Sequence, residues 1–130
     1  MAELQVCIEC GMEKAAPGER PAGEVLYELI ERMVDELGME GLQARQVACL
    51  GNCDADCRLA LADPDRWSWM LGQLDPVDDE ALLRDVIALW LAAPKGLIPK
   101  ADRPVGLKDK TLGRMPPVMT SNRGVLRPRR

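Results

Sequence analysis

Some segments of the chain alternate between apolar and polar residues, and others repeat apolar residues at helical spacing. Residues 3–8 alternate, which predicts a short strand. Over residues 25–37 apolar residues recur at steps of one and three, which predicts an amphipathic helix. Gly38 follows at once, where a residue in the left-handed conformation often ends a helix.

The next fifty residues carry the same two kinds of pattern. Residues 43–48 form a short run between Gly41 and a cysteine cluster, which suits a second strand. Residues 58–62 and 66–74 flank an Asp-Pro-Asp turn signal and predict a hairpin. Acidic residues 78–80 then begin a second helix, which is expected to end at Pro94 and Gly96. The predicted core includes the tryptophans Trp67, Trp69 and Trp90.

This order of strand, helix, strand, strand, strand and helix predicts an α/β fold. A helix between the first two strands makes a parallel crossover, and the hairpin extends the sheet antiparallel. We expect a thioredoxin-like, four-stranded mixed sheet with two main helices, formed by residues 1–94. Five prolines beyond residue 95 predict an extended wrapping segment over residues 95–117 and a disordered basic tail over residues 118–130.

Composition narrows the class of protein. A chain of 130 residues with 47% hydrophobic and 29% charged residues fits one globular domain. The absence of histidine excludes His-dependent catalysis and Cys/His zinc sites. The longest uncharged stretch, residues 86–94, is far shorter than the roughly 20 residues that span a bilayer. The acidic opening argues against a secretory signal, so we expect a cytoplasmic protein.

Charge divides the chain in two. Residues 1–94 hold 7 basic and 19 acidic residues, whereas residues 95–130 hold 10 basic and 2 acidic residues. The basic segment is expected to pack against or fold over the acidic body. Nucleic acid is not expected as a partner, because the acidic body would repel phosphate.

All five cysteines fall in two short clusters. Cys7 and Cys10 are spaced C-x2-C at the end of the first predicted strand, and Cys49, Cys53 and Cys57 are spaced C-x3-C-x3-C after the second. Because the carboxyl ends of neighbouring parallel strands meet at one edge of a sheet, we expect the two clusters to converge. Thiolates converging without histidine are the ligand set of an iron–sulfur cluster or of tetrahedral zinc.

Other interpretations of the cysteines stay open at this point. Zinc is a competitor because its sites often use two short cysteine hooks, although the predicted helices and sheet need no metal in order to fold. A redox dithiol fits less well, because that motif belongs at the start of a helix and here a loop of about a dozen residues intervenes. The thiols could also be small buried residues.

The second cysteine cluster carries a resemblance to a known group. Cys49-Leu50-Gly51-Asn52-Cys53, after a strand and before a hairpin, resembles the second ligand pair of the thioredoxin-like [2Fe-2S] ferredoxins. The chain is still more similar to a related family of small bacterial proteins, described as predicted metal-binding and often encoded near cobalamin-synthesis genes. The likeness covers about residues 4–117 and rests on both cysteine clusters and on residues 67–69, 72–76 and 92–99.

By this resemblance Cys7 and Cys10 match the first ligand pair, and Cys49 and Cys53 match the second. The ferredoxins usually separate their first two cysteines by many more residues, and they lack a counterpart to Cys57. Which four of the five thiols bind is therefore open, with Cys57 either an alternative ligand or a buried residue under the cluster. The resemblance also implies a link to cobalamin synthesis, such as electrons for cobalt or corrin reduction.

We therefore expect a [2Fe-2S] ferredoxin-like carrier of single electrons that is not an enzyme. The alternative is a thiolate zinc- or cobalt-binding protein, for metal delivery or structure, without electron transfer. A redox partner is expected to dock at an acidic rim around the cysteines, no membrane is expected as a partner, and a homodimer is compatible with the sequence. The expected rim consists of Glu9, Glu13, Asp54, Asp56, Asp63 and Asp65.

Overall fold

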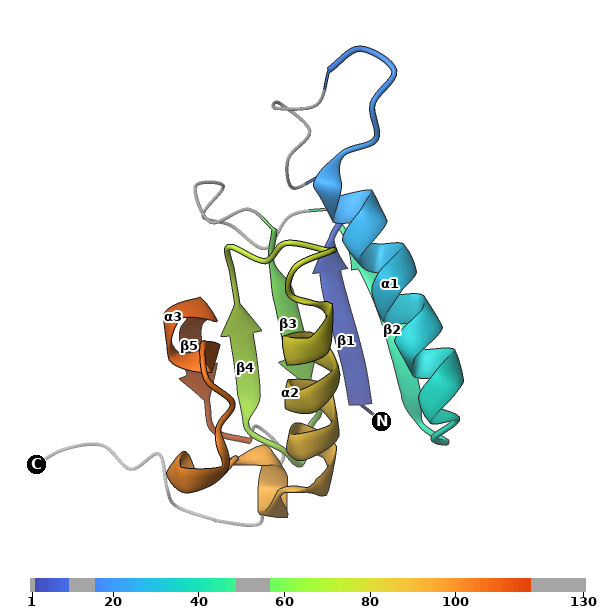
Figure 1. Cartoon of the computed structure of the whole chain (residues 1–130). Coiled ribbons are helices and arrows are strands. Elements are labelled where there is room, and N and C mark those ends of the chain that lie inside the picture. Colours follow the sequence, from blue (N-terminus) through green and yellow to red (C-terminus); the bar gives the residue numbers. More distant parts are fainter. Residues whose placement is uncertain (1, 10–15, 49–56, 118–130) are drawn as a thin grey trace, which may run out of the picture.

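The computed structural model describes residues 2–9, 16–48 and 57–117, which include one mixed five-stranded sheet (Figure 1). The strands lie in the order β2-β1-β3-β4-β5 across this sheet. Their bounds are Ala2–Cys7 for β1, Leu42–Val47 for β2, Leu59–Ala62 for β3, Ser68–Leu71 for β4 and Thr111–Met115 for β5.

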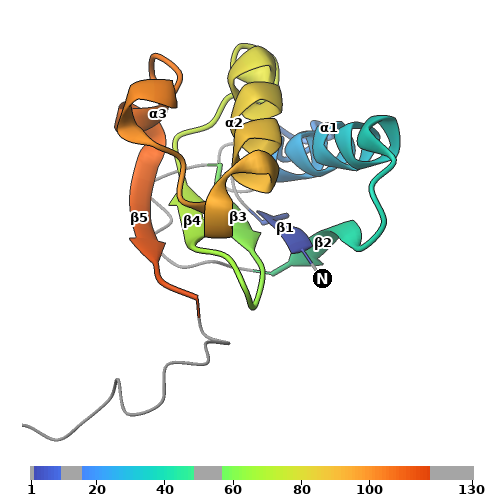
Figure 2. The same ribbon diagram turned by 90° about the horizontal axis from the view of Figure 1, so that it is seen from below.

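Two long helices cover the same face of the sheet (Figure 2). The helix α1 (Ala22–Leu37) connects β1 to β2, and α2 (Glu80–Ala92) follows β4. Within the described ranges, neither these nor the shorter helices have the length and apolar character needed to cross a membrane. The shorter helices are η2 (Pro94–Gly96), η3 (Lys100–Asp102) and α3 (Leu107–Lys110).

The predicted crossover and hairpin are both present. β1 and β2 are parallel, from the pair Ala2↔Leu42 to the pair Cys7↔Val47. β3 is antiparallel to β1, and β4 is antiparallel to β3. The predicted α/β class with a mixed sheet is therefore confirmed. Gly38 has a φ of 59° and ends α1 in the left-handed conformation, as predicted.

The expectation of four strands is wrong, because residues 111–115 form a fifth strand. β5 pairs antiparallel with β4, with a register shift between Met70 and Leu71. Its sequence, TLGRM, shows no clear alternation because β5 is an edge strand with mostly exposed side chains. This segment is a strand because it pairs with β4, and no local sequence pattern indicates that pairing. The expected disordered tail, residues 118–130, lies outside the described part of the chain.

The core lies between the sheet and the two long helices. The predicted apolar stripes of both helices face this layer, and Trp69 and Trp90 are almost completely buried. Their assignment to the core is confirmed, whereas Trp67 is half-buried. The buried helical residues are Gly23, Leu26, Leu29, Ile30 and Met33 on α1 and Leu83, Val86, Ile87 and Trp90 on α2.

Trp69 attaches the segment after residue 95 to the core. Its indole N–H donates a hydrogen bond to the carbonyl oxygen of Gly96 at 2.8 Å. The guanidinium carbons of Arg103 and Arg114 lie 5.4 and 5.1 Å from the centre of its ring, within the range of cation–π attraction. One buried side chain thereby contacts three separate parts of residues 95–117.

Asp75 organises the turn that leads into α2. Its carboxylate accepts hydrogen bonds from the backbone N–H groups of Val77 at 2.8 Å and Asp78 at 2.9 Å. These bonds lower the pKa of Asp75 below its ordinary value, because they favour the charged carboxylate. The bond from Asp78 has the larger effect. In return, the backbone N–H of Asp75 donates to the carboxylate of Asp79 at 2.7 Å.

We expect Asp75→Asn to be less stable than the wild type at neutral pH and nearly equal to it in strong acid. Because the pKa is depressed in the folded state, the stabilisation is complete above the ordinary pKa of the carboxyl. It is lost as the pH falls through the folded-state value. Urea unfolding over a series of pH values from neutral to strong acid tests this, and a deficit that stays constant across the whole series would contradict it.

Candidate functional site

Cys7, the first of the predicted ligands, is the last residue of β1 and is 1% exposed. It pairs with Val47 at the end of β2. Its thiol donates to the carbonyl oxygen of Ala48, with 3.6 Å between Sγ and oxygen. Ala48 directly precedes Cys49, so the second cysteine cluster begins one residue after a contact with Cys7.

Cys57 lies at the same end of the sheet. Because β3 is antiparallel to β1, the start of β3 lies beside the end of β1. The backbone N–H of Cys7 donates to the carbonyl oxygen of Arg58 at 3.3 Å, and the carbonyl of Cys57 accepts from the N–H of Leu74 at 3.2 Å. Cys57 is 2% exposed. This burial is compatible with both interpretations of Cys57, as a ligand and as a buried residue under the cluster, and its service as a ligand stays a prediction.

The other predicted ligands, Cys10, Cys49 and Cys53, lie outside the described residues. Across residues 2–9, 16–48 and 57–117 no group of three or more His, Cys, Asp or Glu side chains is arranged to hold a metal ion. These ranges contain two of the five thiols. The complete ligand set therefore stays a prediction, and the described structure contributes the positions of Cys7 and Cys57.

Arg58 is a residue of this end that sequence reasoning missed. It is 1% exposed and is the one charged residue of the described chain that is buried. Its Nη2 lies within donating distance of the Cys7 Sγ, at 3.9 Å. In the sequence Arg58 is only the first residue of a predicted hairpin, and nothing local distinguishes a buried arginine from an exposed one. The one indication in the sequence that Arg58 lies near the site is its position directly after Cys57.

Gly23 brings the start of α1 into close contact with the end of β1. A Cβ at this position would lie 2.3 Å from the carbonyl oxygen of Cys7 and 3.0 Å from the carbonyl carbon of Ile8. Both atoms belong to the backbone, so a side chain could not be accommodated by a rotamer change. A residue without a side chain is therefore needed where α1 packs against Cys7.

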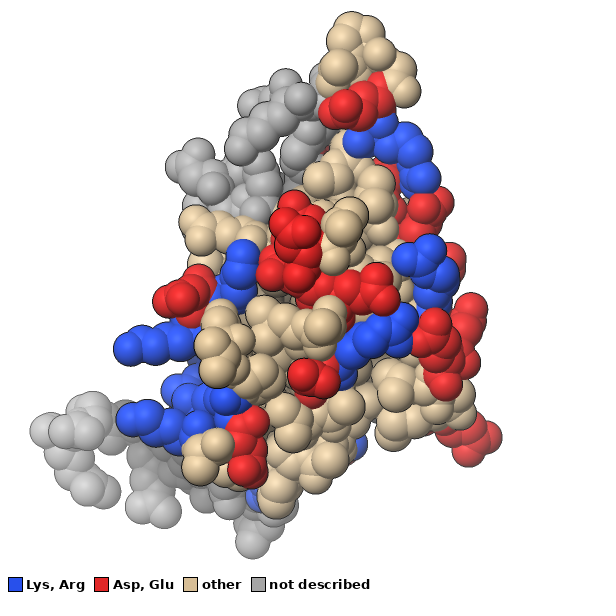
Figure 3. Space-filling view, in the orientation of Figure 1, with Lys and Arg blue, Asp and Glu red and all other residues tan. Residues whose placement is uncertain are grey.

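An acidic hollow lies on α1 beside this end of the sheet. It has a volume of about 380 Å³ and lies next to Ile8, the residue after Cys7. Arg20 forms ion pairs with Glu24 at 3.5 Å and Glu28 at 2.8 Å, and its hydrogen bond to Glu28 lowers the pKa of that carboxyl. Figure 3 shows acidic side chains along α1, whereas basic side chains gather over the elements after residue 95. The hollow is lined by Ile8, Arg20, Glu24, Tyr27, Glu28, Glu31 and Gln46.

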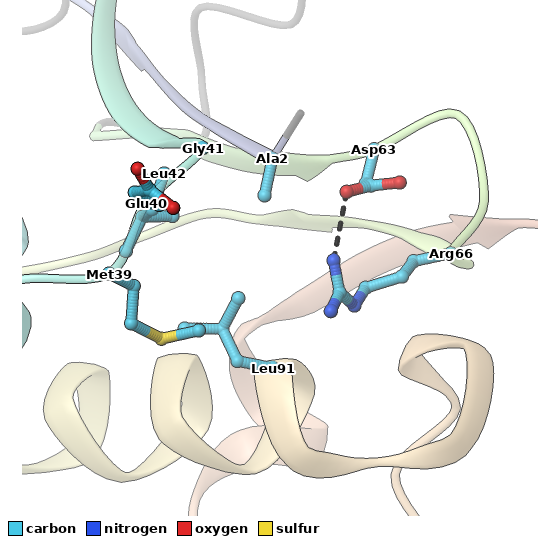
Figure 4. A pocket seen from close by; sticks show the side chains of 8 residues that line it. All are labelled: Ala2, Met39, Glu40, Gly41, Leu42, Asp63, Arg66 and Leu91. Carbon is cyan, nitrogen blue, oxygen red and sulfur yellow. Dashed lines mark hydrogen bonds and ion pairs between the residues drawn. The ribbon is translucent and has the colours of Figure 1, made fainter.

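The expected acidic rim is partly wrong, because Asp63 and Asp65 lie at the opposite end of the sheet from Cys7. β3 runs away from the cysteines, and its last residue, Ala62, pairs with Glu3 near the start of β1. Asp63 lines a pocket of about 220 Å³ at that far end (Figure 4). There it forms an ion pair with Arg66 at 2.8 Å.

The other members of the expected rim have different outcomes. Glu9 is exposed and lies two residues after Cys7, at the predicted end. Glu13, Asp54 and Asp56 lie outside the described residues. The glutamates of α1 in the acidic hollow were missed, although their spacing on the polar face of a predicted helix is visible in the sequence.

Comparison with known proteins places the chain in a protein family. Residues 4–117 match the model of a protein family described as "Protein of unknown function (DUF1636)". No curated protein and no solved structure matches the chain. The match extends over both cysteine clusters and over every helix and strand from α1 to β5.

Proposed function

This chain belongs to the family DUF1636, whose description states no function, and we propose that it is a ferredoxin-like carrier of single electrons with one cysteine-ligated [2Fe-2S] cluster. Cys7, Cys10, Cys49 and Cys53 are the proposed ligands. When bound, the cluster would supply a centre that changes its charge by one electron. No bond to a substrate needs to form or break, and a partner protein would supply the electron while another would receive it.

The observation that carries this proposal is the meeting of Cys7, Cys57 and the end of β2 at one end of the sheet. β1 ends in Cys7, β2 ends at Val47 opposite Cys7 and two residues before Cys49, and β3 begins at Leu59, two residues after Cys57. These segments are far apart in the sequence. The parallel crossover and the antiparallel β3 place Cys7, Cys57 and the end of β2 at the same end of the sheet, which supports the proposal that the remaining cysteines join them in one multi-thiolate site.

The surroundings of Cys7 support the proposal of a thiolate-bound metal centre. The sulfur atom of Cys7 is buried and lies beside a buried guanidinium, and sulfur is the ligand atom that iron–sulfur clusters use. Zinc also binds thiolates. The strand order β2-β1-β3-β4, with a parallel crossover and two helices, supports the finer proposal of a thioredoxin-like fold. A place in cobalamin synthesis stays a hypothesis from the resemblance.

A basic surface on the redox partner is the proposed docking chemistry. Glu24, Glu28 and Glu31 line the hollow beside Ile8, and Glu9 is exposed next to it, so the acidic groups lie near the proposed centre. Arg20 offsets part of this charge through its ion pairs. Carboxylates near a redox centre attract a basic partner and orient its approach.

We expect protein purified without oxygen to be brown, with charge-transfer absorption and about two irons and two sulfides per chain. Iron, sulfide, zinc and cobalt are quantified on the same sample as the spectrum. A colourless sample with one zinc per chain would contradict the electron carrier and support the thiolate zinc protein instead. Cobalt in place of iron would support a role in metal handling.

Cysteine variants test the ligand set in the same assay. Cys49→Ala and Cys53→Ala should lose the cluster, because each removes a ligand. Cys57→Ala is the matched control, since it removes a buried thiol that is not among the four proposed ligands. Full metal content in Cys49→Ala or Cys53→Ala would show that the site is wrong, and loss of metal in Cys57→Ala alone would assign that thiol as a ligand.

A further inference from the structure

Arg58 places a permanent positive charge inside the end of the sheet where the cysteines meet. Its side chain is 1% exposed, and its Nη2 lies 3.9 Å from the Sγ of Cys7. Its carbonyl oxygen accepts the N–H of Cys7 at 3.3 Å, so both its backbone and its side chain contact the same residue. The backbone hydrogen bond continues the pairing of β1 with β3 and places Arg58 beside Cys7.

The guanidinium of Arg58 stays protonated in proteins and therefore carries a fixed positive charge. The charge of the sulfur that it faces depends on the state of the site, because a metal-bound cysteine is a thiolate and carries a full negative charge. Arg58 and Cys7 are thus an arrangement that suits the metal-bound state better than the neutral thiol.

We propose that Arg58 is a positioning residue of the iron–sulfur site, whose charge raises the reduction potential of the cluster. This inference rests on the proposed function and goes beyond it, because it assigns the tuning of the potential to one residue. The inference concerns Arg58 and two neighbouring cysteines. Arg58 contacts Cys7 and directly follows Cys57 in the sequence.

The direction of the effect follows from charge. A [2Fe-2S] centre with four thiolates has a formal charge of minus two when oxidised and minus three when reduced. A fixed positive charge nearby stabilises the more negative form more strongly, and burial weakens the screening by water. Removal of that charge is expected to lower the ratio of reduced to oxidised protein about tenfold at a fixed ambient potential, which for one electron corresponds to about 59 mV.

The test compares three variants with the wild type in the full chain. Arg58→Met removes the charge and keeps a long apolar side chain, and it is expected to retain iron and to have the lower potential. Arg58→Lys retains a charge and should stay close to the wild type. Arg45→Met is the matched control, because Arg45 lies on the neighbouring strand β2 with its side chain 58% exposed, and its potential should not change.

A second measurement uses the wild type itself and does not depend on the folding of Arg58→Met. Protein labelled with ¹⁵N in its arginine side chains is reduced, and pulsed electron paramagnetic resonance records the nitrogen nuclei coupled to the unpaired electron. A guanidinium against a ligand sulfur should give a ¹⁵N coupling. This coupling should vanish in Arg58→Lys and persist in Arg45→Met.

The outcomes separate this inference from the proposed function. If the wild type contains no iron, both are overturned. If the wild type and Arg58→Met contain equal iron and have equal potentials, only the role of Arg58 is overturned. A missing ¹⁵N coupling in iron-loaded wild type overturns it in the same way. The inference is supported if Arg58→Met has a lower potential than the wild type and the other two variants do not. If Arg58→Met does not fold, the predicted ¹⁵N coupling in the wild type supports it instead.

Discussion

Trp69→Ala is expected to lower the free energy of unfolding by about 3–5 kcal/mol, the cost of truncating a large aromatic side chain in a core. Trp69 is 2% exposed, its N–H bonds the carbonyl of Gly96, and two guanidinium groups lie over its ring. The substitution creates a cavity and releases the contacts with residues 96–114. Since small domains have about 5–15 kcal/mol of stability in total, this is a large fraction of it.

Urea unfolding followed by far-ultraviolet circular dichroism measures this change. Trp69→Phe is the matched control, because it keeps most of the ring but removes the N–H donor to Gly96. It should cost about 1–3 kcal/mol, mainly because a buried carbonyl loses its partner. A Trp69→Ala variant within 1 kcal/mol of the wild type, on the order of the scatter of surface changes, would show that Trp69 does not hold the C-terminal segment in place.

Gly23→Ala is expected to destabilise the fold by about 2–3 kcal/mol and to reduce metal binding. The new Cβ would lie 2.3 Å from the carbonyl oxygen of Cys7, so α1 or the end of β1 must move. Alanine favours a helix over glycine by about 1 kcal/mol, so net destabilisation means that the clash outweighs the gain in propensity. Because the clash lies at a proposed ligand, iron content should fall together with stability.

The matched control is Gly113→Ala in the edge strand β5. A Cβ there meets no atom within 4 Å, and its backbone does not have a positive φ. Its stability is expected to stay within about 0.5 kcal/mol of the wild type, as for other exposed substitutions. If Gly23→Ala were as stable as Gly113→Ala and retained its iron, the close packing of α1 on Cys7 would have no consequence for the site.

Much of the secondary structure could be predicted because it depends on local patterns. The stripe over residues 25–37 and the left-handed Gly38 gave α1 nearly to its bounds, and the Asp-Pro-Asp turn gave the β3–β4 hairpin. β5 could not be predicted in the same way. Its residues are mostly exposed, and hydrogen bonding to β4, a strand about forty residues earlier, determines its conformation.

The candidate site shows the same division. That cysteines cluster after two strands is readable in the sequence, and a parallel crossover makes their convergence a reasonable expectation. The position of Arg58 was not readable, because burial of an arginine depends on what surrounds it. Asp63 and Asp65 were assigned to the wrong end, because counting residues along a hairpin does not show that β3 leads away from Cys7.

The sequence by itself therefore determined the α/β class, the two amphipathic helices, the hairpin and the presence of two cysteine clusters, all of which depend on residues close together in the chain. Tertiary pairing determined the fifth strand, the contact of Arg58 with Cys7 and the end of the sheet at which each acidic residue lies. Hydrogen bonds and burial between segments far apart in the sequence produce these features. Their energies depend on distance in space, which a local pattern does not contain.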